Sequence, residues 1–168
     1  MYMMNCYIII RGPLGCGKTT ISKKLSKAIN GRYISIDKIL DKHNLTKYKE
    51  NGYISQKAFI KVNDIIIQDM EKFLNKGIPI IIDGNFYWRS QITDIIKRLS
   101  LYPHYVFTLK TSLETCLKRD NTRKECYGKN AVEAVYKKSI EFDYGISIDV
   151  TKSLDASMKK IFSHLKNR

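Results

Sequence analysis

A glycine-rich segment from Gly12 to Thr19 has the spacing G-x-x-x-x-G-K-T. This spacing is typical of a loop whose glycines let successive backbone N–H groups converge on a polyphosphate. The ammonium group of Lys18 can reach the β- and γ-phosphates, and the hydroxyl of Thr19 can bind Mg²⁺. We therefore predict an ATP and Mg²⁺ site whose nucleotide contacts come from Gly12, Pro13, Leu14, Gly15, Cys16, Gly17, Lys18, Thr19 and Thr20.

The residues on either side of this segment support that interpretation. An apolar run from Tyr7 to Ile10 precedes the glycines and predicts a strand, and a helical pattern starts at Lys18. Apolar residues of that helix recur on one face, at Ile21, Leu25 and Ala28. The alternative is a glycine-rich turn before an ordinary helix, with the lysine and the threonine there by chance.

Two aspartates follow predicted strands, at the sheet edge where open α/β folds bind ligands. Asp37 ends the strand predicted at 32–36, and Asp83 ends the apolar run at 78–83. Asp83 can hold Mg²⁺ directly or through water, or it can cap the turn that follows. Asp37 is placed for a catalytic role, or for capping the short helix after it.

Two arginines, Arg119 and Arg123, lie in a charged and glycine-containing segment, residues 118–130, that we predict to be a mobile lid. Their i, i+4 spacing puts both on one face if the preceding helix continues through them. Guanidinium groups there could close over the phosphates and stabilise the charge of a transferring phosphoryl group. The alternative is a solvated basic face.

Strands and helices alternate along the chain, which predicts a parallel sheet with helices on both faces. The fold class expected is α/β, a three-layer sandwich of the P-loop NTPase type. Ser55 and Ser112 are expected to cap helices, and residues 43–52 are expected to form a loop. The five strands are expected near residues 7–10, 32–36, 78–83, 104–109 and 146–150.

Length and composition limit the classes of function. The chain of 168 residues predicts one domain, 1–168. Its net charge of +14 indicates acidic partners, such as a polyanionic substrate or nucleic acid, or else lysines on solvated helix faces. No apolar run reaches the roughly 18 residues that span a bilayer, and no C-x-x-C pair occurs. We therefore expect a cytoplasmic protein without a membrane partner or a zinc site.

Taken together, the motifs resemble the P-loop kinases of the nucleoside-monophosphate-kinase-like group. The resemblance is closest to the polynucleotide-kinase-like and zeta-toxin-like branch, which has an AAA domain. It covers nearly the whole chain and rests on the phosphate loop, on Ser35 to Leu40 around Asp37, on Asp83-Gly84-Asn85 with Arg89, and on residues 118–123 followed by 131–135.

This resemblance implies an ATP-dependent phosphotransferase that moves the γ-phosphoryl group to a hydroxyl or phosphate of a small molecule or nucleotide. It implies that Asp37 takes the proton from the acceptor hydroxyl. It also implies that Thr151 and Lys152, just after the last strand, lie near the adenine. Lys18, Arg119 and Arg123 would complete the catalytic set around Asp37.

We expect Asn85 and Arg89, in the polar loop after the third-strand aspartate, to contact the acceptor. Arg89 could clamp an acidic group, or the neighbouring Phe86, Tyr87 and Trp88 could stack on a base. The alternative is that Tyr87 and Trp88 cover the sheet edge.

The acceptor stays open at this stage. Asp37 lacks the surrounding charged cluster of the polynucleotide kinases, and Asp83-Gly84 is not followed by the proline usual in adenylate kinases. A polynucleotide 5′-hydroxyl kinase is one alternative to a small-molecule kinase. A P-loop ATPase or nucleotide switch that acts through a protein partner is another.

Overall fold

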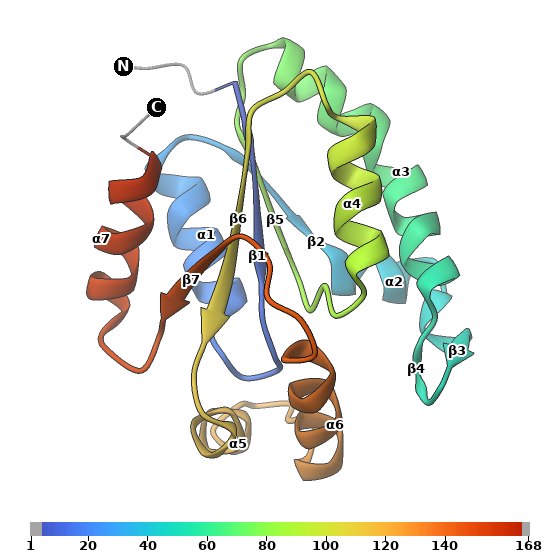
Figure 1. Cartoon of the computed structure of the whole chain (residues 1–168), viewed down its shortest axis with the longest axis vertical. Helices are drawn as coiled ribbons and strands as arrows, with labels where there is room; N and C mark the ends of the chain where they lie inside the picture. Colours follow the sequence, from blue (N-terminus) through green and yellow to red (C-terminus); the bar gives the residue numbers. More distant parts are fainter. Residues whose placement is uncertain (1–4, 166–168) are drawn as a thin grey trace.

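The computed structural model describes residues 5–165, so residues 1–4 and 166–168 of the predicted domain lie outside the described residues. At its centre is a five-stranded parallel sheet with the strand order β2-β5-β1-β6-β7 (Figure 1). The strands are β1 (Tyr7–Arg11), β2 (Arg32–Ser35), β5 (Ile80–Gly84), β6 (His104–Lys110) and β7 (Ile146–Asp149). The predicted five-stranded parallel sheet is therefore confirmed.

Helices cover both faces of the sheet and make the three expected layers. One face carries α1 (Lys18–Ala28) and α7 (Leu154–Leu165), and the other carries α3 (Gln56–Asn75) and α4 (Arg89–Arg98) (Figure 1). Three further helices gather at the carboxyl end of the strands: α2 (Ile36–Lys42), α5 (Leu113–Asn121) and α6 (Lys129–Ser139). None of the helices within residues 5–165 combines the length and apolar character needed to cross a membrane.

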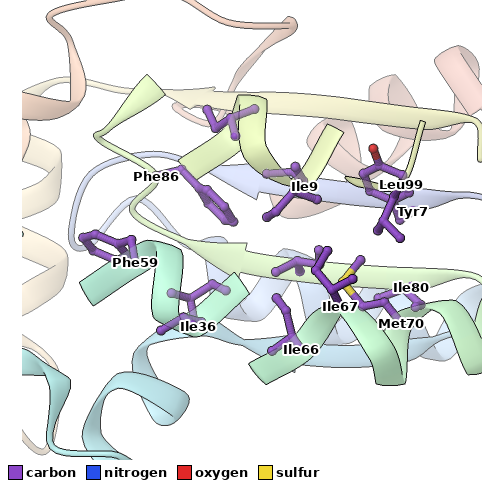
Figure 2. Packing of buried hydrophobic residues seen from close by; sticks show 14 of the residues in the cluster. Tyr7, Ile9, Ile36, Phe59, Ile66, Ile67, Met70, Ile80, Phe86 and Leu99 are labelled. Atoms are coloured by element: carbon purple, nitrogen blue, oxygen red, sulfur yellow. The ribbon is translucent and has the colours of Figure 1, made fainter. Parts of the chain in front are cut away.

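The two faces of the sheet bury different side chains of the same strands. In β1, Tyr7 and Ile9 pack towards α3 and α4, whereas Ile8 and Ile10 pack towards α1 and α7. Successive side chains of a strand point to opposite faces of the sheet, and here both faces are covered by helices. Figure 2 shows the cluster on the α3 and α4 side, which includes Tyr7, Ile9, Ile66, Met70, Ile80 and Phe86. The phosphate loop therefore starts from a fully buried and fixed strand.

Both predicted helix caps are confirmed. The Ser55 hydroxyl accepts a hydrogen bond of 3.2 Å from the backbone N–H of Ala58 at the start of α3. The Ser112 hydroxyl accepts one of 3.1 Å from the backbone N–H of Thr115 at the start of α5. Each serine satisfies a donor that the first helical turn leaves unpaired.

Residues 43–52 contain more regular structure than the expected loop. They form a 3-10 turn at Leu45–Lys47 and then β3 (Lys49–Glu50), which pairs with β4 (Tyr53–Ile54) in an antiparallel hairpin. Two aromatic residues after β5, Tyr87 and Trp88, hold this hairpin by hydrogen bonds. The indole nitrogen of Trp88 donates to the carbonyl of Ile54 at 2.8 Å, and the backbone N–H of Ile54 donates to the hydroxyl of Tyr87 at 3.2 Å.

The predicted lid at residues 118–130 is divided among three elements. Residues 118–121 belong to α5, residues 129–130 begin α6, and a short connection lies between them. The expectation that Arg119 and Arg123 lie on one continuous helix is wrong, because α5 ends at Asn121. Any joint action of the two arginines must therefore come from the way that the connection folds.

Arg11, the last residue of β1, is fully buried. Its guanidinium group donates to the carbonyls of Ser139 at 3.1 Å and Phe142 at 3.3 Å, and to the hydroxyl of Thr108 at 3.2 Å. The group also lies 4.4 Å from the centre of the Phe142 ring. Burial lowers the pKa of Arg11 to about 10. Arg11 thus joins the strand before the phosphate loop to the end of α6.

We expect Arg11→Met to lower the free energy of unfolding by about 2–4 kcal/mol. The methionine side chain has a similar length, but it cannot donate hydrogen bonds to the buried carbonyls that Arg11 contacts. Urea denaturation followed by circular dichroism measures this loss. Lys23→Met, on the exposed face of α1, is the matched control and should change the stability by less than about 0.5 kcal/mol. Equal stability of the two variants would contradict the role given to Arg11.

Candidate active site

The phosphate loop joins β1 to α1, and its three glycines adopt backbone conformations that favour glycine. Gly15 and Gly17 have φ angles of +77° and +97°, in the left-handed region that other residues rarely adopt. A Cβ atom on Gly15 would also lie 2.4 Å from the carbonyl oxygen of Cys116 in α5. Gly15 therefore permits both the turn of the loop and the close approach of α5.

Lys18 is the first residue of α1, and its side chain folds back over the loop. Its ammonium group donates to the carbonyl of Pro13 at 2.7 Å, and most of the side chain is buried. The neighbouring Cys16 is enclosed, and burial raises the pKa of its thiol. The Cys16 thiol therefore stays protonated and unreactive at neutral pH.

A cavity of about 370 Å³ opens beside the loop, and we name it the phosphate cavity. The four residues predicted to be catalytic all line it: Lys18, Asp37, Arg119 and Arg123. Further predicted nucleotide contacts along its wall are Leu14, Gly15, Gly17, Thr19 and Thr20, with Tyr127 beside them. Gly12 and Pro13 are buried behind this wall. Residues far apart in the sequence thus meet around one space that can hold phosphates.

Asp37 is the second residue of α2, and Ser35 occupies the N-cap position. The alternative that Asp37 is the cap of this helix is therefore wrong. Desolvation raises the pKa of Asp37 above its usual range, the positive charge of Lys18 opposes the shift, and Asp83 adds to it. The carboxylate therefore stands in the field of the ammonium group that would bind the phosphates.

Asp83 lies in β5 beside Ser35 of β2, and it is buried. One of its carboxylate oxygens accepts a hydrogen bond of 3.0 Å from the hydroxyl of Tyr33. Burial and the charge of Asp83 raise the pKa of Tyr33 to about 12, although a hydrogen bond with Thr19 opposes this shift. Tyr33 thus keeps its proton and connects the two residues predicted to bind Mg²⁺.

The oxygen atoms of Thr19 and Asp83 are the kind of ligand that Mg²⁺ prefers. Within residues 5–165, no group of three or more His, Cys, Asp or Glu side chains could hold a metal ion by itself. Mg²⁺ commonly binds through one or two protein groups and completes its shell with phosphate oxygens and water. The residues present therefore fit a magnesium–nucleotide complex better than a separate metal centre.

A second cavity, of about 200 Å³, lies between the phosphate loop and α7, and we name it the α7 cavity. Lys152, predicted to lie near the adenine, lines this cavity. Thr151 does not, and its hydroxyl instead donates to the carboxylate of Asp149 at 2.6 Å. The remaining walls come from Cys16, Gly17, Thr20, Ile21, Arg119, Val150, Leu154 and Ser157.

Arg119 lines both the phosphate cavity and the α7 cavity. Its guanidinium group donates to the carbonyl of Cys16 at 3.3 Å and to the carbonyl of Val150 at 2.9 Å. These two bonds connect α5 to the phosphate loop and to the end of β7. Arg119 is therefore anchored to both the phosphate loop and the residue after β7, while the mobility predicted for residues 118–130 stays a prediction.

Asp120 is buried at the end of α5. Its two carboxylate oxygens accept hydrogen bonds from the backbone N–H groups of Tyr127 at 3.1 Å and Gly128 at 3.0 Å. Arg123 lies in the connection that these bonds close, with its guanidinium 4.6 Å from the centre of the Tyr127 ring. Asp120 thus holds the connection in the shape that brings Arg123 to the phosphate cavity.

A third cavity, of about 350 Å³, lies beside the β3–β4 hairpin, and we name it the hairpin cavity. It shares Leu14, Asp37 and Tyr127 with the phosphate cavity. Asn85, predicted to contact the acceptor, lines it. Arg89, predicted to do the same, lines neither cavity, and its guanidinium lies over the rings of Phe142 at 5.1 Å and Tyr144 at 5.6 Å.

Comparison with known proteins agrees with this architecture. Residues 8–142 match the AAA domain family. The chain belongs to this family. The curated deoxyguanosine kinase of Bacillus subtilis is 25% identical over 173 residues, which cover 90% of this chain and 83% of the relative. With its phosphate loop and this relationship, the AAA domain described here is a P-loop kinase, as the sequence predicted.

Solved structures confirm the fold. A sugar kinase from a Janibacter species superposes with a TM-score of 0.78 at 14% identity, over 95% of this chain and 93% of that structure. A gluconokinase from Sinorhizobium meliloti superposes with a TM-score of 0.71, also at 14% identity, over 96% of both chains. At this identity the similarity shows that the helices and strands are arranged alike. It does not identify the acceptor of this chain.

Sequence reasoning missed two residues that organise the site of this AAA domain. Asp120 follows Leu113, Cys116 and Leu117 at helical spacing, so it falls on the buried side of α5. A carboxylate on such a stripe must find N–H donors, and this signal was available. Tyr33 gave no comparable signal, because only the pairing of β2 with β5 brings its hydroxyl to Asp83.

We expect Asp120→Ala to reduce turnover by about tenfold or more, because Arg123 is no longer held at the phosphate cavity. Hydrogen exchange of residues 122–128 should become faster in the same variant, since two N–H groups lose their acceptor. Steady-state kinetics and hydrogen-exchange mass spectrometry test both effects. Glu125→Ala, at an exposed position of the same connection, is the control. Unchanged exchange in Asp120→Ala would contradict this role.

Proposed function

We propose that this kinase moves the γ-phosphoryl group of ATP to a hydroxyl group of a small acceptor, with Asp37 as the general base. The observation that carries the proposal is the position of Asp37, which lines both the phosphate cavity and the hairpin cavity. A nucleotide in the first cavity and an acceptor in the second would meet at this carboxylate. A nucleotide switch has no need of a base between two cavities, so the kinase is favoured over that alternative.

In the proposed reaction, the oxygen of the acceptor hydroxyl bonds to the γ-phosphorus while its proton passes to the Asp37 carboxylate. The bond between the γ-phosphorus and the bridging β-γ oxygen breaks, and ADP leaves with that electron pair. The raised pKa of Asp37 suits this task, because a base is most effective when its pKa approaches the working pH.

Positive charge around the phosphates would supply most of the remaining stabilisation. Phosphoryl transfer depends mainly on positioning and on charge stabilisation. Lys18 and Arg123 line the phosphate cavity, and Arg119 lies between it and the α7 cavity. We propose that Lys18 and the two arginines bind the triphosphate, and that the adenine occupies the α7 cavity beside Lys152.

We further propose that Thr19 and Asp83 hold Mg²⁺ with the nucleotide, through the hydroxyl and the carboxylate that Tyr33 connects. The chemistry that the ion supplies when bound is neutralisation of charge on the phosphate oxygens. Tyr33 orients the Asp83 carboxylate by donating to one oxygen, which leaves the other oxygen for the ion or its water.

A small acceptor fits the hairpin cavity better than a polynucleotide end. The volume of about 350 Å³ lies in the range of small-molecule sites. A polynucleotide is held through several phosphates by lysine and arginine, whereas Lys49 is the one such residue among the described lining residues. The closer assignment of the chain to the polynucleotide-kinase-like branch stays a prediction. The cytoplasmic location expected from the sequence also stays a prediction.

Lys18→Ala should lower turnover by about a thousandfold, which corresponds to about 4 kcal/mol of lost transition-state stabilisation. The reason is the removal of the positive charge nearest the phosphates. Steady-state assays with purified, folded protein test this expectation, with Lys23→Ala on the exposed side of α1 as the control. Wild-type kinetics in Lys18→Ala would overturn the nucleotide site.

Asp37→Asn and Asp83→Asn should have different phenotypes. Asp37→Asn should lower turnover by roughly 10²–10⁴ at saturating Mg²⁺ with ATP affinity retained. In the wild type, turnover should fall as the pH drops through the raised pKa of Asp37, since a protonated carboxyl cannot accept a proton. Asp83→Asn should instead raise the Mg²⁺ concentration needed for half-maximal rate.

Magnesium titrations and pH–rate profiles of the two variants separate these roles. The acidic limb assigned to Asp37 should disappear in Asp37→Asn and persist in Asp83→Asn. Full turnover in Asp37→Asn would show that this carboxylate is not the base. An unchanged magnesium dependence in Asp83→Asn would exclude it as a metal residue.

A further inference from the structure

The hairpin cavity also limits the chemistry of the acceptor. We propose that the acceptor is an uncharged hydroxyl compound with a flat ring, as in a nucleoside, and not a phosphorylated or carboxylated compound. This inference rests on the proposed function, because it takes the hairpin cavity as the place where the acceptor binds. Three features of the cavity carry it: charge, aromatic walls and one unpaired amide.

The charges of the cavity oppose an anionic acceptor. Asp37 and Asp41 both line it, and Lys49 supplies the one positive charge among its described lining residues. The charge of Asp41 contributes to the raised pKa of Asp37, so the two carboxylates already repel each other. A carboxylate or phosphate on the acceptor would add a third negative charge, and the described residues that line the cavity include no arginine to bind it as a fork.

The walls of the cavity favour a flat ring. Three tyrosines, Tyr53, Tyr87 and Tyr127, line it together with apolar side chains such as Val135. The Tyr53 hydroxyl donates to the carbonyl of Ala134 at 3.3 Å, and the Tyr87 hydroxyl accepts the bond from the β4 backbone. Tyr87 is buried against Tyr53, Phe59 and Trp88, so Tyr53 and Tyr127, which keep exposed surface, are the rings that a ligand can reach. Aromatic rings bind flat heterocycles by stacking.

One amide in the wall lacks a partner. Asn85 is only 8% exposed and lines the cavity, and its Oδ1 has no hydrogen-bond partner among the described residues. A buried acceptor of this kind is costly to leave unpaired, and its own surface is almost fully covered. A ligand that donates a hydrogen bond would therefore satisfy it once the Asn85 amide rotates towards the cavity. The N–H and hydroxyl groups of a nucleoside can donate, whereas an ionised carboxylate cannot.

The test compares acceptors that differ in charge and in shape. Deoxyguanosine, its 3′- and 5′-monophosphates, gluconate and glucose are each added to the full chain. Each monophosphate keeps one free hydroxyl, so it differs from the nucleoside mainly in charge. Binding is measured by thermal stabilisation without ATP, and phosphate gain is measured by mass spectrometry with ATP and Mg²⁺. We expect the nucleoside alone to stabilise the protein and to gain phosphate.

Tyr53→Leu tests whether the aromatic wall holds the ring. It should weaken nucleoside binding by about tenfold to a hundredfold, the effect of losing one stacked ring, while the KM for ATP stays unchanged. Tyr48→Leu is the matched control, because Tyr48 is exposed in the same segment and does not line the cavity. Equal nucleoside affinity in Tyr53→Leu and Tyr48→Leu would overturn the assignment of the wall.

The outcomes separate this inference from the proposed function. Preferred phosphorylation of a monophosphate, gluconate or glucose would overturn the inference and leave the kinase proposal intact. Binding of deoxyguanosine that depends on Tyr53 but yields no phosphorylated product would support the inference and overturn the proposed transfer to a hydroxyl. Absence of binding by deoxyguanosine would overturn the inference.

Discussion

The site depends on one close contact, between the phosphate loop and the backbone of α5. A side chain at Gly15 would collide with the carbonyl of Cys116, so the loop and the helix can approach only through a glycine. That approach brings Arg119, almost one turn further along α5, to the carbonyl of Cys16. Asp120, the residue before the last one of the same helix, closes the connection carrying Arg123. The two arginines of the phosphate cavity are therefore positioned by the packing of α5 on the loop.

The base proposed for the reaction is governed by opposing electrostatic effects. Burial and neighbouring carboxylates favour the protonated form of Asp37, whereas Lys18 and Arg123 favour the ionised form. Binding of a triphosphate would partly neutralise those cations, and its negative charge would raise the pKa of Asp37 further. Asp37 would then accept a proton more readily when the nucleotide is present. If Asp37 is the base as proposed, its position between two cavities would couple nucleotide binding to its basicity.

The strongly basic composition is distributed unevenly over the molecule. Of the ion pairs formed by the described residues, most join side chains at the surface, such as Lys24 with Asp155, and such exposed pairs contribute little stability. Three arginines are used differently: Arg11 is buried as a donor to backbone carbonyls, and Arg119 and Arg123 line the phosphate cavity. None of these three arginines lines the hairpin cavity. Between the two cavities, the one where phosphates would bind therefore has three positive side chains among its described lining residues, and the one where the acceptor would bind has one.

Local spacing in the sequence determined the phosphate loop, the five strands and the caps at Ser55 and Ser112, because each depends on neighbouring residues or on a short hydrophobic period. It did not determine the β3–β4 hairpin, the bond from Tyr33 to Asp83, or the placing of Arg89 over two aromatic rings. The last two join segments that are distant along the chain, and only the packed sheet and helices bring them together. The hairpin itself is local, spanning residues 49–54, but its hydrogen bonds to Tyr87 and Trp88 come from a distant segment. The tertiary structure likewise decided that Asp37 lies between two cavities, since their walls come from segments spread over most of the chain.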